Sequence, residues 1–179
     1  ASTYLLAAAA EAAQAIESFV VATGVSDLDF DVEQAGAMTE EVNQRRSLSL
    51  ASVQGKLGVR VAFTLASFPR DKWDTPGGMS PASLGVVASA LAAGVKLGRV
   101  NLMTMDFGPY FSDGKAMGDL AVSALRDANT QLRALIPGLD EAGAYALLGA
   151  TPMIGKNDVA SEVFSLQDAQ ILVSFAKEK

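Results

Sequence analysis

Cysteine and histidine are both absent from this chain of 179 residues. Without cysteine, the chain has no disulfide framework, no thiolate zinc site and no thiol nucleophile. Without histidine, a Ser-His-Asp triad and a histidine-ligated metal cluster are excluded too. Acid–base chemistry in this chain therefore has to come from Asp, Glu, Tyr or Lys side chains.

Positive charge is scarce as well. Lysine and arginine together number 14 against 20 aspartates and glutamates, which gives a net charge of −6 and an isoelectric point near 4.6. Proteins that bind the phosphate backbone of nucleic acids usually carry basic patches, so we expect no nucleic-acid partner. Half of the residues are hydrophobic, which is enough for the core of one domain.

Long apolar runs are also missing. The longest run, Tyr4–Ala10, is too short to span a bilayer, which takes about 20 residues. It has no basic flank and so does not match a signal peptide. From this pattern we expect no membrane partner.

The spacing of apolar residues predicts one helix followed by four strand–helix units. The predicted helices are Thr3–Ala22, Glu40–Leu57, Pro81–Lys96, Met117–Leu135 and Leu166–Lys179. The predicted strands are Leu28–Val32, Val59–Ala66, Val100–Met105 and Tyr145–Ala150, with loops at Pro69–Pro81 and Phe107–Gly114. This alternation predicts an α/β fold with a parallel sheet, and no change in composition divides residues 1–179.

Helix ends can be predicted from single residues. Thr39 and Ser165 have the side chains of N-caps, and Asp168 stands three residues after Ser165, in the place of the usual Glu of a capping box. Gly24 and Gly58 are the expected stops of the two helices that precede them.

The first predicted strand carries an unusual row of acids, DLDFDVE. Because side chains alternate along a strand, one face holds the four acids Asp27, Asp29, Asp31 and Glu33. The other face holds Leu28, Phe30 and Val32. Both faces of an open doubly wound sheet are covered by helices and are apolar, whereas the inner face of a barrel can hold polar residues near the carboxyl ends of its strands.

Carboxylates this close together repel each other, so at least one of the four carboxyl groups should have a raised pKa. Glu33 ends the strand, nearest the expected active-site rim, and is the best candidate for a proton donor. Asp31 is its nearest partner, and Asp29 can share charge or protons with Asp31. These three residues are the predicted catalytic group.

Two other interpretations of the acidic strand need weighing. A calcium-binding EF-hand loop needs Gly at its sixth position and Glu at its twelfth, where this chain has Val32 and Met38. A solvated edge strand whose charges face water is the more general alternative, and it stays open at this point.

Three motifs in order resemble the family-18 glycoside hydrolases. DLDFDVE is similar to the strand-four signature D-x-x-D-x-D-x-E, with Ser26 in the place of the first Asp. VNLMTMDFG, at 100–108, resembles the strand-six motif M-x-Y-D and its bacterial chitinase variant M-T-M-D-(Y/F)-G. Thr151–Val159 and Ser161–Phe164 resemble strand seven and the loop that follows it in bacterial chitinases.

This resemblance implies hydrolysis of chitin by a (β/α)8 barrel, in which the substrate's own acetamido oxygen is the nucleophile. It gives Glu33 the role of acid and base, Asp31 that of orienting the acetamido group, and Asp29 that of tuning Asp31. Met103 and Asp106 are expected to line the floor of the sugar subsite. No cofactor and no metal are implied, and the substrate partner is chitin or a chitooligosaccharide.

One position departs from the family pattern. Met105 stands where the M-x-Y-D form has a Tyr whose hydroxyl holds the acetamido carbonyl, and a Met side chain cannot donate that hydrogen bond. Tyr110 is a candidate for the missing donor, although an ordinary loop aromatic is the simpler interpretation. Trp73 could stack on a sugar ring or could be a packing anchor.

The chain has too few strands for a complete barrel, which needs eight strands and about 250 residues. The resemblance places the four predicted strands as the fourth to seventh. We therefore expect a piece of a longer secreted enzyme, completed either by the other half of the barrel or by a second copy of this chain.

Other functions stay open at this stage. One is a chitin-binding lectin of the same fold, which Met105 favours. Another is an endo-β-N-acetylglucosaminidase acting on N-glycans. A third is a magnesium-dependent phosphohydrolase, although the chain lacks a glycine-rich phosphate loop before a helix.

Overall fold

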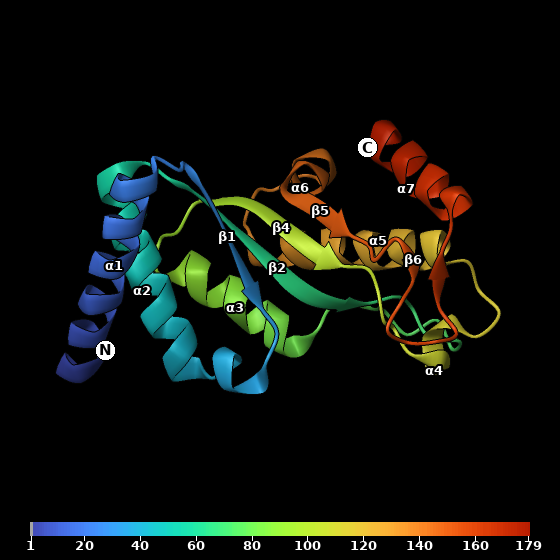
Figure 1. Ribbon diagram of the computed structural model, residues 1–179, viewed down its shortest axis with the longest axis horizontal. Coiled ribbons are helices and arrows are strands. Elements are labelled where there is room, and N and C mark those ends of the chain that lie inside the picture. The colour runs from blue at the N-terminus through green and yellow to red at the C-terminus, as the bar shows by residue number, and fades with distance from the viewer. Residues whose placement is uncertain (1) are drawn as a thin grey trace. The chain divides into compact units, whose positions relative to one another are not determined.

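The computed structural model describes residues 2–179, which form two compact units (Figure 1). Unit 1 consists of residues 2–63 together with Pro81–Val100. Unit 2 consists of Thr64–Ser80 and Asn101–Lys179. Strands β2 (Arg60–Phe68) and β4 (Leu97–Met103) contribute their first halves to unit 1 and their second halves to unit 2.

Unit 1 begins with α1 (Thr3–Thr23), β1 (Asp27–Val32), the 3-10 turn η1 (Ala35–Met38) and α2 (Glu40–Leu57), and it also contains α3 (Pro81–Ala92). The predicted cap at Thr39 and the predicted stops at Gly24 and Gly58 are confirmed. The Thr39 side chain accepts the Val42 N–H, and Gly24 and Gly58 end α1 and α2 with φ of 71° and 68°. A residue with a Cβ adopts this left-handed conformation only with strain, which is why glycine stands at both stops.

The sheet of unit 1 runs in the order β1, β2, β4. Since α2 connects β1 to β2 and α3 lies between β2 and β4, these are crossover connections that join parallel strands. The row that faces the helices is buried and consists of Leu28, Val32, Val61, Phe63 and Val100. Side chains on the other face of β1 are exposed, so only one face of this part of the sheet is covered.

Unit 2 contains a two-residue strand β3 (Gly78–Met79), α4 (Pro109–Ser112), α5 (Met117–Leu135), α6 (Glu141–Leu147), β5 (Leu148–Thr151), the strands β6 (Gly155–Lys156) and β7 (Val163–Phe164), and α7 (Leu166–Glu178). Here β5 follows β4 in the sheet, β3 pairs antiparallel with the end of β2, and β6 and β7 form a separate antiparallel pair.

The core of unit 2 joins α5 to the loops that carry the strand-six and strand-seven motifs. Its central cluster consists of Phe107, Met117, Leu120 and Phe164. The buried Asp168 side chain closes the predicted capping box with Ser165 and also accepts the Gly118 N–H at 2.7 Å. These contacts fix the start of α7 against the start of α5.

One predicted strand is wrong in its first half. Residues 145–147 are helical, because the Asp140 side chain caps α6 by accepting the Gly143 N–H at 2.7 Å. The Tyr145 ring then packs edge-on against Phe175, with 5.5 Å between ring centroids. Only residues 148–151 form the strand β5.

Three further differences concern helix and loop boundaries. Helix α3 ends at Ala92, four residues before the predicted end, because Gly94 turns the chain with a φ of 85°. The predicted loops at 69–81 and 107–114 contain β3 and the single turn α4.

Helix α1 also differs from the expectation that no segment could cross a membrane. By length and composition alone, Thr3–Thr23 is long and apolar enough to do so, and it is the one such helix among residues 2–179. Core helices and signal sequences pass the same test.

Candidate functional site

The acidic row predicted from the sequence is present on β1 in unit 1. Leu28 and Val32 are buried, and the Phe30 ring lies 6.1 Å from the Phe63 ring on the covered face. The side chains of Asp29 and Asp31 are exposed on the opposite face. Glu33 follows the last residue of the strand and is exposed too. The strand therefore separates its apolar and acidic residues as the alternation predicts.

The four acids do not form a uniform row of repelling charges. Asp27 accepts hydrogen bonds from both Nε and Nη2 of Arg60, the latter at 2.6 Å, and from the Ser26 hydroxyl at 2.9 Å. The bond from Arg60 is the chief reason why the pKa of Asp27 is lowered. The negative charge of Asp27 is therefore paired with Arg60, whereas Asp31 and Glu33 lie further towards the carboxyl end.

A hollow of about 430 Å³ opens beside the first residues of β1. It is lined by Asp27, Leu28, Asp29, Arg60, Val61, Ala62, Gly98 and Arg99. The two arginines and two aspartates give this hollow no net formal charge. Asp31 and Glu33, further along the chain, are both acidic and do not line it.

The strand-six motif lies in unit 2, at the end of β4. Met103 is the last residue of the strand, and its carbonyl accepts the Ser67 hydroxyl at 2.8 Å. Met105 and Asp106 follow in a turn, and both are half-buried. Asp106 has a φ of 50°, in the left-handed region that few residues other than glycine adopt.

The side chain of Asp106 holds the strand-seven loop. Its Oδ1 accepts the Val159 N–H at 2.8 Å, and its own N–H donates to Oδ1 of Asn157 at 3.4 Å. Asn157 in turn donates to the carbonyls of Met153 and Gly155. Asp106 therefore connects the turn after β4 to the strand-seven loop. Asn157 caps the turn that follows β5.

Trp73 and Tyr110, both predicted to bind substrate, lie next to each other in unit 2 as part of a cluster of Phe68, Trp73, Tyr110 and Phe111, called the aromatic cluster below. Their ring centroids are 6.0 Å apart, and the Trp73 and Tyr110 side chains are 68% and 51% exposed. Tyr110 packs edge-on against Phe111 at 4.9 Å, and Phe111 stacks on Phe68. The Lys72 ammonium lies 4.5 Å from the Trp73 ring centroid.

A turn built on Asp71 holds Trp73 in this place. Oδ1 of Asp71 accepts the N–H groups of Trp73 at 2.8 Å and of Thr75 at 2.9 Å, and its Oδ2 accepts the Tyr110 hydroxyl at 3.3 Å. The Thr75 N–H is the chief cause of the lowered pKa of Asp71. The bond from the Trp73 N–H, two residues after Asp71, is that of an Asx-turn, which Asp favours, so this residue could have been found in the sequence.

The same loop is anchored to α5 by a buried carboxylate. Asp127 accepts a hydrogen bond from Nη2 of Arg70 at 2.6 Å and another from the Gly77 N–H at 2.8 Å. The partners are 57 and 50 residues away in the chain, so no local pattern marks Asp127 as important. The loop that carries Trp73 is thus fixed at both ends of its turn.

The predicted site residues fall into two groups. Asp29, Asp31 and Glu33 belong to unit 1. The residues expected to contact the sugar, Met103, Met105, Asp106, Tyr110 and Trp73, belong to unit 2. Within unit 2, the structure brings Trp73 and Tyr110 together, while Met103, Met105 and Asp106 follow one another along the chain.

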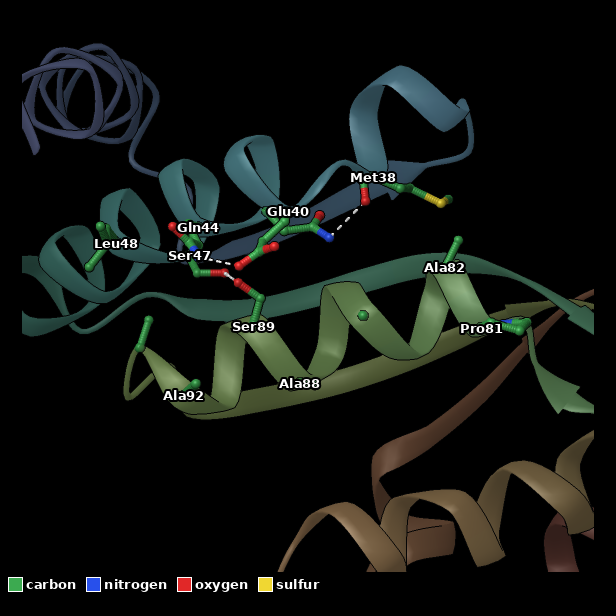
Figure 2. Close-up of a pocket in the computed structure, with 13 residues that line it drawn as sticks. Met38, Glu40, Gln44, Ser47, Leu48, Pro81, Ala82, Ala88, Ser89 and Ala92 are labelled. Carbon is green, nitrogen blue, oxygen red and sulfur yellow. Dashed lines mark hydrogen bonds between the residues drawn. The ribbon is translucent and has the colours of Figure 1, made fainter. Parts of the chain in front are cut away.

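Unit 1 has a second hollow, of about 630 Å³, between α2 and α3 (Figure 2). Ser47 and Ser89 meet across it, with 3.0 Å between their hydroxyl oxygens, and the Asn43 side chain donates to the Met38 carbonyl. None of the β1 acids lines this hollow. Because this hollow lies between helices and contains none of the predicted catalytic acids, it is not a candidate for the predicted reaction.

No family model matches the sequence, but the similar proteins found by sequence and by structure are all named chitinases. The chain is 34% identical over 163 residues to a probable bifunctional chitinase/lysozyme of Escherichia coli (strain K12) and, over the same length, to endochitinase 11 of Metarhizium anisopliae. Each match covers 85% of this chain, but only 17% and 30% of those proteins.

The catalytic domain of a hyperthermophilic chitinase from Pyrococcus furiosus has the same fold, with a TM-score of 0.78 and 28% identity over 93% of this chain. The chain is similar to these chitinases in both sequence and fold. The match covers 50% of the solved chitinase domain, so the chain corresponds to half of a chitinase catalytic fold.

The chitinase match confirms the predicted fold class, a partial α/β barrel with about four strand–helix units. It also confirms the resemblance to glycoside hydrolases that the three motifs indicated. Another solved structure, of catalytic-site mutants of the Pyrococcus furiosus chitinase, contains chito-oligosaccharides and matches with the same TM-score of 0.78.

Proposed function

We propose that this chain is the part of a chitinase barrel that carries the acid–base residues, and that it takes part in hydrolysis of β-1,4-linked N-acetylglucosamine polymers. The observation that carries the proposal is the exposed row of Asp29, Asp31 and Glu33 opposite the buried apolar face of β1. The relationship to chitinases and the three motifs support the same assignment.

The proposed reaction follows the substrate-assisted scheme implied by the family resemblance. Glu33 gives its proton to the glycosidic oxygen as that oxygen leaves the anomeric carbon. The substrate's acetamido oxygen forms the new bond to that carbon, and Asp31 stabilises the positive charge that develops on the acetamido group. Glu33 then takes a proton from the water that opens this intermediate, and the configuration at the anomeric carbon is retained.

The exposure of Glu33 sets a condition on this mechanism. A carboxyl group holds a proton at neutral pH when it is partly removed from water or close to another negative charge. Glu33 is exposed in this structure, so the cover would have to come from the remaining part of the barrel. We therefore propose that full activity needs the remaining part of the barrel and that the complete enzyme acts on chitin outside the cell.

The aromatic cluster supports a sugar-binding role for unit 2. The apolar face of a pyranose packs on flat aromatic rings, and Trp73 and Tyr110 present such rings to solvent. The Tyr110 hydroxyl already donates to Asp71, so its use as the donor that replaces the missing Tyr at position 105 would require that bond to break. We propose that Tyr110 contributes its ring.

A non-catalytic chitin-binding lectin is the second candidate, because Met105 lacks the hydroxyl of the family motif. An endo-β-N-acetylglucosaminidase has a similar acidic strand, but the names of the relatives favour chitinase. Both candidates predict binding of N-acetylglucosamine oligomers. A lectin would release no reducing sugar. An endo-β-N-acetylglucosaminidase would release it from N-glycans and not from chitin.

Glu33→Gln is the decisive variant. Loss of the proton donor should lower the rate of chitooligosaccharide hydrolysis by at least about a hundredfold, since general acid catalysis contributes on this scale, and should leave binding nearly unchanged. Release of reducing sugar by the chain combined with the remaining part of the barrel measures the rate, and Glu41→Gln on the exposed face of α2 is the matched control. Equal rates in the Glu33→Gln variant and the unsubstituted protein would rule out this role.

A further inference from the structure

Glu162 is a buried carboxylate that the proposed reaction does not use. It is 1% exposed and lies just before β7 in the strand-seven segment. Its Oε1 accepts the Gly108 N–H at 2.7 Å, and its Oε2 accepts the Phe107 N–H at 3.1 Å. Burying a carboxylate is costly unless its oxygens are hydrogen-bonded, so these two bonds account for its place.

The contact between the two segments is reciprocal. Glu162 of the strand-seven loop binds N–H groups of the turn after β4, while Asp106 of that turn binds the Val159 N–H of the strand-seven loop. The Asn157 N–H also donates to the Glu162 carbonyl at 3.0 Å. Each segment thus has a carboxylate that holds the backbone of the other.

The turn that Glu162 holds has an unfavourable backbone. Asp106 has a φ of 50° and Gly108 a φ of 83°. A left-handed non-glycine residue is unfavourable and persists only where its surroundings fix it. Phe107, between them, is buried in the core cluster of unit 2.

The direction of the chain after this turn depends on the same contacts. Gly108 precedes α4, and α4 carries Tyr110 of the aromatic cluster. We propose that Glu162 is a positioning residue, which fixes the turn 106–108 and thereby sets the places of Asp106 and the Tyr110 ring for sugar binding. The sugar part of this inference rests on the proposed function.

Glu162→Gln tests the proposal because the variant keeps the shape of the side chain. The amide can accept only one of the two N–H bonds, and its own NH2 group faces the other donor. Amide exchange of Phe107 and Gly108 should become faster, and the emission of Trp73, the sole tryptophan of the chain, should change as Tyr110 shifts. Both are measured on the full chain well below its melting temperature.

Binding of a chitooligosaccharide, followed by the emission of Trp73, is the second measurement. We expect the dissociation constant to rise about tenfold in Glu162→Gln, because small displacements of binding groups have large effects. Glu162→Asp keeps the charge, and its dissociation constant should lie between those of the unsubstituted chain and Glu162→Gln. Glu178→Gln, at an exposed glutamate of α7, is the matched control and should bind like the unsubstituted chain.

The outcomes separate this inference from the proposed function. A Glu162→Gln variant that melts at a lower temperature but keeps the exchange rates and the affinity of the unsubstituted chain would show a purely structural role and overturn the inference. If the unsubstituted chain binds no oligosaccharide, the proposed function and the sugar part both fail. Unchanged amide exchange at 107–108 contradicts the inference whatever the sugar result.

Discussion

At the scale of single residues, Thr104 is exceptional because its buried hydroxyl has no hydrogen-bond partner among residues 2–179. Its backbone is satisfied, since its N–H donates to the Thr151 carbonyl at 3.1 Å. The cost of an unpaired buried hydroxyl is therefore confined to one side-chain atom.

Thr104→Val removes that hydroxyl with little change of shape. We expect the free energy of unfolding to rise by about 1 kcal/mol, measured as an increase in the urea midpoint. Thr39→Val is the contrasting control, because it removes the side-chain acceptor that caps α2 and should lower the same quantity by about 1 kcal/mol. A loss of stability in Thr104→Val would mean that the hydroxyl has a partner.

Single residues also show where prediction from the sequence stops. The acids of β1 could be found because a strand alternates, and the separation of the acids from the apolar residues on the two faces is confirmed. Asp127 and Glu162 could not be found, because their roles come from backbone N–H groups about 50 residues away. Whether Asp29, Asp31 and Glu33 act as predicted stays a prediction.

At the scale of elements, long helices were predicted well because their ends have local causes. Helices α2 and α5 have the predicted bounds, and α7 differs by one residue. Short elements could not be predicted in this way. Strands β3, β6 and β7 have two residues each, and their pairing depends on contacts made only in the folded chain.

The contact between α5 and α7 depends on a glycine. A Cβ added at Gly118 would lie 2.8 Å from both the Cα and the carbonyl oxygen of Asp168, closer than backbone atoms allow. Gly118→Ala should therefore lower the free energy of unfolding by about 1–3 kcal/mol, measured by urea unfolding.

Gly55 in α2 is the matched control, since a Cβ there meets no atom within 4 Å. Gly55→Ala should raise stability by about 0.5–1 kcal/mol, because alanine is the better helix former. Equal changes in the two variants would show that the close approach at Gly118 does not limit packing.

At the scale of the whole molecule, the chain presents surface that a soluble domain usually covers. On α1, the exposed apolar side chains include Tyr4, Leu6, Phe19 and Val21. Strand β1 is also at one end of the strand order, so one of its edges has no strand partner among the described residues. Such edges and apolar faces favour association.

We expect the purified chain to associate, either with a separately produced second half of the barrel or with another copy of itself. Sedimentation equilibrium should give a mass above the 18.5 kDa of one chain. Addition of the complementing half should restore hydrolysis if the first explanation holds, whereas a dimer that is active alone supports the second. A stable soluble monomer would contradict both.

The turn at Asp71 has a consequence for the thermodynamics of recognition. Because Asp71 accepts the Trp73 backbone N–H and the Arg70–Asp127 pair anchors the same loop, the backbone that carries the indole is fixed before any ligand binds, and binding has to order few additional backbone torsions. The entropic penalty of ordering this loop is met when the polypeptide folds rather than at each encounter.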